Sequence, residues 1–295
     1  MNRILSYTVP PEEDNCKAEV FLRRRGFSHH LLSILRRTEL GLTRNGVLMF
    51  TTARLQVGDV LRVLVADTEA SPNIVPRPLP FPIVYEDEDI LVVDKPASMP
   101  IHPSQGNYEN TLGNAAAYYF AQKGQPFVYR VINRLDRDTT GLFILAKNPL
   151  SSCILSAAAK ERRIHREYFA IAEGILPKVG IIDAPIGRVP HSTVLHQVDF
   201  QHGKPAVTHF KRLKVVNGQS LAAVTLETGR THQIRVHFRY LGHPLPGDFL
   251  YNPHYEKIGR QALHSHKLAF MHPITGEPLE FTSPLPTDMQ QCLEK

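Results

Sequence analysis

Apolar and polar positions follow two patterns along the chain, one helical and one strand-like. Residues 18–26 and 28–37 carry apolar side chains at helical spacing with arginines between them, which predicts two short helices. Residues 55–65 indicate a turn and a strand, residues 83–95 a hairpin, and the apolar run 142–146 a buried strand. Many short strands at hairpin spacing predict an α+β fold, with a large mixed, mostly antiparallel sheet and flanking helices.

A proline-rich stretch divides the chain into two parts. Residues 67–82 hold five prolines, four of them at alternate positions, which predicts an extended and stiff linker. We therefore expect a small α+β domain over residues 1–66, in which residues 1–15 form an acidic lead-in, and a second domain over residues 83–295. A chain of 295 residues is long enough for two domains.

Positive charge is concentrated in the first part. Residues 16–65 contain nine lysines and arginines and three acidic residues, an excess equal to the net charge of +6 of the whole chain. Clustered arginines on helices are typical of proteins that contact nucleic-acid phosphates. The alternative is a solvated basic face on a structural domain. The residues that we expect to contact RNA are Arg23, Arg24, Arg25, Arg36 and Arg37.

The same segment has a recognisable order of elements. Two basic helices are followed by an Asn45-Gly46 turn, a Gly58-Asp59 pair and a final strand. This arrangement resembles the RNA-binding domain first seen in small-subunit ribosomal protein S-four.

The cysteines and the hydropathy of the chain indicate the cellular compartment of the protein. Cys16, Cys153 and Cys292 are scattered and form neither a metal-site spacing nor a disulfide framework, so we expect a cytoplasmic protein with free thiols. The polar start of the chain is unlike a signal peptide, and no run of 18 apolar residues predicts a membrane span.

The densest group of reactive side chains immediately precedes the buried strand 142–146. Residues 133–141, NRLDRDTTG, place two carboxylates, two guanidiniums and two hydroxyls in one short loop. The simplest interpretation is a turn with an Asp–Thr hydrogen bond and surface ion pairs. A polar cluster at the end of a buried strand is also typical of a catalytic site.

This loop resembles the catalytic motif of pseudouridine synthases of the RluA type, roughly His-Arg-Leu-Asp-x-x-Thr-Ser-Gly. Asn133 replaces the usual His, and Thr140 replaces the usual Ser. In that family the Asp after Arg-Leu is essential, so the resemblance assigns this role to Asp136. Asp138 falls on a variable position and inherits no role.

Further segments extend the resemblance over residues 83–285. The family's Lys-x-Tyr-x-Ala-x-Val-x-Gly matches residues 166–174 at Tyr168, with Arg166 for the Lys, and its Gly-Arg-x-His-Gln-Leu/Ile-Arg-x-His matches residues 229–237 at every fixed position. Residues 95–103 resemble its Lys-Pro-x-Gly segment, with Ser98 where Gly is common. Residues 242–248, GHPLPGD, and 263–273 match its later turn and closing strand pair.

The resemblance implies an enzyme that isomerises uridine in structured RNA and needs no cofactor or metal. Large-subunit ribosomal RNA is the favoured substrate because of the basic domain, and transfer RNA is the alternative. We expect a monomer. Asp136, Tyr168 and Arg235 are the predicted catalytic residues, with Arg230 as second choice for the cation beside Asp136. The predicted substrate-binding residues are Arg134, Arg137, Thr139, Arg230, His232, Gln233 and Leu268.

Two other classes of function remain as alternatives. The departures at Asn133, Ser98 and Arg166 would fit a non-catalytic RNA-binding or ribosome-assembly factor on the same fold. A glycosidase or aspartic hydrolase would use Asp136 together with Asp138.

Histidines in the matching segments could indicate a metal site, but none has an Asp, Glu or Cys at a metal-site spacing. We expect structural roles for His232, His237, His264 and His266.

Overall fold

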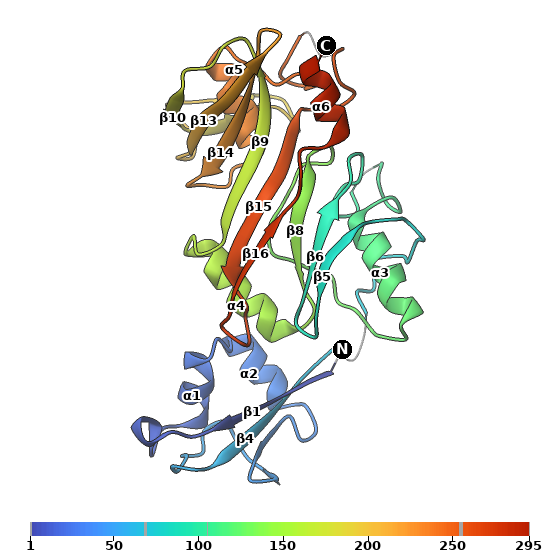
Figure 1. The fold of residues 1–295 in the computed structure, drawn as a ribbon. Coiled ribbons are helices and arrows are strands. Elements are labelled where there is room, and N and C mark those ends of the chain that lie inside the picture. Colours follow the sequence, from blue (N-terminus) through green and yellow to red (C-terminus); the bar gives the residue numbers. More distant parts are fainter. Residues whose placement is uncertain (1, 68–69, 105, 254–255, 295) are drawn as a thin grey trace.

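The computed structural model describes residues 2–67, 70–104, 106–253 and 256–294. The chain forms two sheets with separate cores (Figure 1). The first is a four-stranded antiparallel sheet in the order β1-β4-β2-β3, with two helices and a short 3-10 turn. Its elements are β1 (Asn2–Thr8), η1 (Pro11–Glu13), α1 (Ala18–Arg24), α2 (His29–Leu35), β2 (Leu42–Arg44), β3 (Val47–Leu48) and β4 (Val60–Ala66).

Local signals in the sequence place most of this first unit. The Ser28 hydroxyl accepts a hydrogen bond from the Leu31 amide and caps α2. Asn45 and Gly46 turn β2 into β3, as predicted. The expected lead-in over residues 1–15 was wrong, because residues 2–8 form β1 and pair along the whole length of β4. That partner lies more than fifty residues away, so no local pattern announces it.

The second sheet has ten strands in the order β10-β13-β14-β9-β15-β8-β6-β5, with β16 paired to β15 and β7 paired to β8. Neighbouring strands are antiparallel except β8 and β15, so the predicted mostly antiparallel sheet is confirmed. The strands are β5 (Ile83–Glu86), β6 (Ile90–Lys95), β7 (Arg130–Val131), β8 (Thr140–Ala146), β9 (His165–Glu173), β10 (Val179–Asp183), β13 (Val207–Val216), β14 (Gln219–Leu226), β15 (Leu263–Met271) and β16 (Pro278–Thr282).

Helices and a small hairpin complete the second unit. Thr111 caps α3 in a capping box with Asn114, and Pro149 is the first residue of α4. None of the helices in the described residues is long and apolar enough to cross a bilayer. The remaining elements are α3 (Leu112–Gln122), α4 (Pro149–Lys160), β11 (Ile186–Arg188), β12 (His196–Val198), α5 (Gln233–Tyr240) and α6 (Thr287–Glu294).

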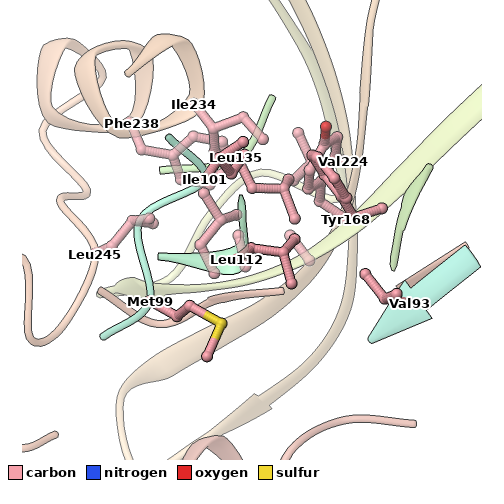
Figure 2. Close-up of a cluster of buried hydrophobic side chains, with 14 of the residues drawn as sticks. Val93, Met99, Ile101, Leu112, Leu135, Tyr168, Val224, Ile234, Phe238 and Leu245 are labelled. Carbon is pink, nitrogen blue, oxygen red and sulfur yellow. The ribbon is translucent and has the colours of Figure 1, made fainter. Parts of the chain in front are cut away.

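The alternation of side chains along the central strands creates two apolar clusters, one on each face of the sheet. In β6, Leu91 and Val93 belong to the cluster that includes residues of α3 and α5, part of which is drawn in Figure 2. Ile90 and Val92 belong to the cluster that packs α4. The candidate site lies over the first cluster.

Helix α4 belongs to both units. Leu150 and Ile154 pack into the core of the first unit, whereas Leu155 and Ala158 pack into the sheet of the second. In Figure 1, α4 accordingly lies between the N-terminal helices and the large sheet.

The proline-rich segment is not a free tether. It lacks helix and strand in its described part, as expected, but it lies against the second unit. Asp67 forms an ion pair with Arg130 (Oδ1–Nη2, 2.5 Å), and the Asn114 side chain donates to the Val75 carbonyl. Leu79 and Phe81 pack on the core of the large sheet. These contacts fix the path of the segment.

Candidate active site

A groove of about 410 Å³ opens where the loop before β8 meets β9 and the start of α5. Such a volume is typical of small-ligand sites. Its lining includes Asp136, Tyr168 and Arg235, the three residues predicted to be catalytic. Asp138 does not line it, so Asp136 and Asp138 do not face one bond, as a hydrolase pair would require.

The central feature of the groove is a carboxylate held by a buried guanidinium. Arg235 Nη1 donates to Asp136 Oδ2 at 2.9 Å, while its Nε and Nη2 donate to the two carboxylate oxygens of Asp248 at 2.7 and 2.8 Å. The Arg235 side chain is 3% exposed and that of Asp136 is 26% exposed. Burial opposes the charge of Arg235, but its hydrogen bonds to Asp248 and the charge of Asp136 outweigh burial and raise the pKa of Arg235. Arg235 therefore stays protonated and places a fixed positive charge beside Asp136.

Apolar neighbours in the sequence position these two charges. Leu135 and Ile234, which precede Asp136 and Arg235, are both buried in the cluster that contains Tyr168. Figure 2 labels Leu135, Ile234 and Tyr168 among the side chains of this cluster. Packing of the two apolar side chains thus sets where the adjacent charged side chains enter the groove.

The loop that carries Asp136 is pinned from behind by Lys95. This side chain is fully buried, and its Nζ donates to the carbonyls of Pro96, Met99 and Arg137. The Ser98 amide donates to Asp138, whose carboxylate also pairs with Arg137. The loop is therefore tied to the end of β6.

Gly141 lets β8 approach β15. Its φ is +108°, and a Cβ added there would lie 2.3 Å from the Ser265 carbonyl oxygen. Only glycine fits this position without displacing a strand.

Two departures from the family motif have structural explanations. Asn133 is buried, and its Oδ1 accepts a hydrogen bond from the Ile144 amide at 2.8 Å, so it ties the loop to β8. Ser98 has a φ of +56°, in the left-handed region that favours the glycine usual there. Asn133 lines the groove, so this departure changes one of its lining groups, whereas Ser98 does not line it.

His232 approaches Asp136 but does not neutralise it. Its Nε2 is 4.0 Å from Asp136 Oδ2, and its Nδ1 is 2.7 Å from the Tyr251 hydroxyl. Burial lowers the pKa of His232 to about 4 despite the attraction of Asp136. The imidazole is therefore neutral near pH 7, and Arg235 is the cation that contacts Asp136.

The remaining predicted substrate residues divide into two groups. Arg134, Thr139 and Arg230 line the groove, with Arg134 exposed and Arg230 Nε donating to the Pro205 carbonyl. Arg137 does not line it, because its guanidinium pairs with Asp138 and so braces the loop.

Gln233 lines the groove, but its amide is used inside the protein. It accepts from Thr228 and the Arg230 amide and donates to Val207 and Thr208. Its structural role is to hold the start of α5, so the prediction that it binds substrate is corrected.

Leu268 was placed wrongly by the sequence. It is fully buried in the cluster that packs α4, on the face of the sheet away from Tyr168. The β15 residue that lines the groove is Leu263. A register shift between Ser265 and Lys267 interrupts the alternation of β15, which the sequence does not reveal.

The N-terminal arginines also differ from one another. Arg24 and Arg25 pair with the buried Glu13, and the Arg25 guanidinium lies 3.4 Å from the centre of the Phe21 ring. The prediction that Arg25 contacts RNA is therefore corrected to a packing role.

The other three arginines lie on the surface. Arg36 contacts Thr51 and Glu19. Arg23 and Arg37 are exposed, and neither forms an ion pair within the residues that the structure describes. These two remain the most available for phosphate contacts.

The histidines of the matching segments are held by protein groups. His237 contacts Thr208 and the Ala184 carbonyl, His264 contacts Thr140, and His266 contacts the Ser283 carbonyl. These contacts fit the structural roles that were expected.

One other group has metal-like geometry. The ligand atoms of Asp87, Asp89 and His272 lie within 4.8 Å of one another. Arg3 and Asn148 already donate to Asp89, while Asp87 accepts from His272 and backbone amides. The lone pairs that a metal would need are engaged, so the cluster joins β1 to the β5–β6 turn instead.

Three residues near the reactive centre were missed by sequence reasoning. Asp248 holds Arg235, Tyr251 holds His232, and Leu263 lines the groove. The Gly-Asp end of the segment 242–248 was a usable signal, because a carboxylate after a tight turn is placed to accept from a nearby guanidinium. Its turn needs Gly247, where φ is +70° and an added Cβ would meet the Arg260 carbonyl oxygen.

Comparison with known proteins gives consistent matches. The family model described as RNA pseudouridylate synthase matches residues 89–240. A Bacillus subtilis (strain 168) protein named "Uncharacterized RNA pseudouridine synthase YjbO" is 38% identical over 270 residues, which are 91% of this chain and 95% of that protein. "Ribosomal large subunit pseudouridine synthase D" of Nitrosomonas europaea is 39% identical over 247 residues, 80% of this chain and 71% of that protein.

Solved structures are also similar. "Human RNA Pseudouridylate Synthase Domain Containing 1" superposes with a TM-score of 0.59 at 29% identity and covers 70% of this chain and 83% of its own. "Human RNA Pseudouridylate Synthase Domain Containing 4", at 23% identity and a TM-score of 0.58, shares the fold.

Proposed function

Because the chain belongs to the RNA pseudouridylate synthase family and is an RNA pseudouridine synthase of the RluA type, we propose that it isomerises specific uridines of large-subunit ribosomal RNA, with Asp136 as the catalytic carboxylate. Family membership confirms the resemblance predicted from the motifs. Support for the ribosomal target comes from the names of similar proteins, several of them called ribosomal large subunit pseudouridine synthase D. It also comes from the basic N-terminal unit.

A single observation carries the assignment of Asp136. Its carboxylate lies in the groove, in contact with the buried Arg235 and in the same lining as Tyr168. A buried cation keeps a neighbouring carboxyl ionised, since an opposite charge within about 4–6 Å favours the charged form. An ionised carboxylate beside an apolar wall suits a reaction that develops positive charge on a sugar.

The reaction breaks the bond between the ribose anomeric carbon and uracil N1. As this bond weakens, positive charge grows on the ribose, as in glycoside hydrolysis, and the Asp136 carboxylate stabilises it. Asp136 then either attacks the anomeric carbon or takes a proton from carbon 2 of the ribose. The freed uracil rotates and bonds to the anomeric carbon through carbon 5. This bond displaces Asp136 from the anomeric carbon or, in the second route, forms as the proton returns to carbon 2; carbon 5 loses its proton and N1 gains one. No atom is added and no oxidation occurs.

The uridine must leave the stacked helix to reach Asp136. We propose that it enters the groove against Tyr168, since stacking of a base on an aromatic ring contributes about 1–3 kcal/mol. Arg134 and Arg230 at the groove lining are positioned to contact the flanking backbone.

The N-terminal unit is proposed as an RNA-binding domain over residues 1–66. Its exposed Arg23 and Arg37 offer charges for phosphates, and α4 fixes the unit beside the catalytic sheet. The distance between the two RNA contacts is therefore set by the fold.

The test is an isosteric change at Asp136. Asp136→Asn removes the charge with little change of shape, and Asp183→Asn on the exposed edge of β10 is the matched control. Both are incubated with unmodified large-subunit ribosomal RNA and with unmodified transfer RNA, and new pseudouridine is counted by mass spectrometry. We expect Asp136→Asn to lose activity by about 1,000-fold or more while RNA affinity is retained.

Two results would contradict the proposal. Pseudouridine formation by Asp136→Asn near the rate of Asp183→Asn would exclude the assigned chemistry. Modification of transfer RNA but not of ribosomal RNA by the unmutated enzyme would exclude the ribosomal target.

A further inference from the structure

A second groove of about 600 Å³ adjoins the catalytic groove. Its lining comes from the C-terminal end of α4, from β9, from the end of β14 and from Lys267 and Ala269 of β15. Figure 1 shows how these elements are arranged. The two grooves share part of their lining, including Lys160, Ile164, Arg166, Leu226 and Arg230. The two grooves are therefore neighbours on the same part of the surface.

The lining of the second groove combines cationic and apolar side chains. Five lysines and arginines line it against two carboxylates, Glu167 and Glu227. Ala159, Ile164 and Ala269 supply apolar surface between them. This combination suits a nucleotide, which presents a phosphate to cations and a ribose or base to an apolar surface.

The cations that line only the second groove are held loosely. Arg162 lies 3.6 Å from Glu227, and Lys267 lies 2.8 Å from Glu280. The Lys267 side chain is partly exposed, and the other three are more exposed than it. Exposed ion pairs contribute about 0–1 kcal/mol, so a phosphate can displace either carboxylate at little cost.

Arg162 also occupies an unusual backbone position. It follows α4 with a φ of +60°, the left-handed conformation in which a helix commonly ends on glycine. An arginine there places a cation at the mouth of the groove at a conformational cost that glycine would avoid.

We propose that the second groove binds the nucleotide next to the target uridine in the same RNA strand, with its phosphate held by Arg162 and Lys267. The proposal rests on the proposed function, since it names where the strand continues once the uridine occupies the catalytic groove. It assigns to these two residues a role in substrate affinity and none in bond breaking.

The left-handed backbone at Arg162 allows a variant that removes the cation without destabilising the fold. Arg162→Gly removes the cation and relieves the left-handed residue, so the melting temperature should stay level or rise. Combined with Lys267→Ala, it removes both proposed phosphate contacts. The matched control is Arg163→Ala, because Arg163 is the adjacent residue, pairs with Glu161 and lines neither groove.

Binding and turnover are measured on unmodified large-subunit ribosomal RNA transcribed in vitro, over a range of salt concentrations. Each phosphate neutralised in a single strand contributes about 0.7 to the slope of log affinity against log salt. Because both side chains hold the same phosphate, the double variant should lose about 0.7. We expect KM to rise about tenfold and the loss to fall on KM rather than kcat. A double variant with the slope and KM of Arg163→Ala overturns the proposal.

The outcome separates this proposal from the proposed function. If the unmutated enzyme forms pseudouridine and the double variant matches the control, the second groove is not an RNA site. If the unmutated enzyme forms none but the double variant still loses salt-dependent affinity, the groove stands as an RNA site and the proposed function fails.

Discussion

The catalytic groove and the N-terminal unit use arginine in opposite ways. Arg235 is 3% exposed and is fixed by three hydrogen bonds between two carboxylates. Arg23 and Arg37 are exposed on or beside the N-terminal helices. The first arrangement fixes the position of a charge, while the second keeps charge available to solvent or phosphate.

The difference matches what the two proposed partners, a ribose in the groove and RNA phosphates at the N-terminal unit, would require. A reacting ribose needs a carboxylate at one position, and a buried guanidinium of fixed geometry provides that position. Phosphates along an RNA strand can be contacted by flexible side chains, since their charge is repeated and screened by salt. Burial thus fixes the position of the charge in the groove, whereas exposure lets the arginines of the N-terminal unit adjust to phosphates at different positions.

Replacing Arg235 should give the largest effect. Arg235→Ala leaves Asp136 and the buried Asp248 without a counter-charge, which costs about 3–5 kcal/mol of unfolding free energy. Arg235→Lys keeps the charge but cannot bridge both carboxylates, so we expect a folded protein with activity at least about 100-fold lower. Urea denaturation and single-turnover assays measure the two effects. Full activity in Arg235→Lys would show that the bridge is dispensable.

Two glycines test how tightly each region is packed. Gly141→Ala meets the Ser265 backbone at 2.3 Å, whereas Gly46→Ala, also at positive φ, meets nothing within 4 Å. We expect Gly46→Ala to cost about 1 kcal/mol for the left-handed backbone alone. Gly141→Ala should cost about 3 kcal/mol, because overpacking adds to that strain. Thermal or urea unfolding of both variants gives the comparison, and equal costs would refute the packing argument.

The smallest effect should come from the exposed arginines. Arg23→Ala and Arg37→Ala should each lower RNA affinity about threefold, reduce the salt slope by about one and leave stability within about 0.5 kcal/mol. Arg25→Ala is the contrast, because it removes the contacts with Glu13 and Phe21 and should lower stability. Filter binding across salt concentrations and melting curves distinguish the two classes. A loss of stability in Arg37→Ala would contradict the view that this arginine serves RNA binding rather than packing.

Motif matching selected three residues that line one groove, because short segments of the sequence carry them. Asp136, Tyr168 and Arg235 lie in three motifs separated in the chain, and the structure brings them to one groove. The three motifs follow one another in the family's order, and only the segment 229–237 matches at every fixed position.

Long-range partners were not accessible in the same way. The pairing of β1 with β4, the Asp248 side of Arg235 and the Tyr251 partner of His232 all depend on where distant segments meet. Leu268 was misplaced because a shift in strand register changes which residues face the groove. Such errors come from tertiary geometry rather than from local preference.

Helix α4 fixes the distance between the two units, because it packs into the cores of both. Leu150 and Ile154 complete the first core, while Leu155 and Ala158 complete the second. Removing the first unit would therefore expose the apolar face of α4 that it covers. The two units should therefore unfold in one transition. An RNA bound to one unit would lie at a distance from the other unit that α4 fixes. The enzyme could then select one uridine by its distance from the proposed RNA contacts on the N-terminal unit, before it recognises any base.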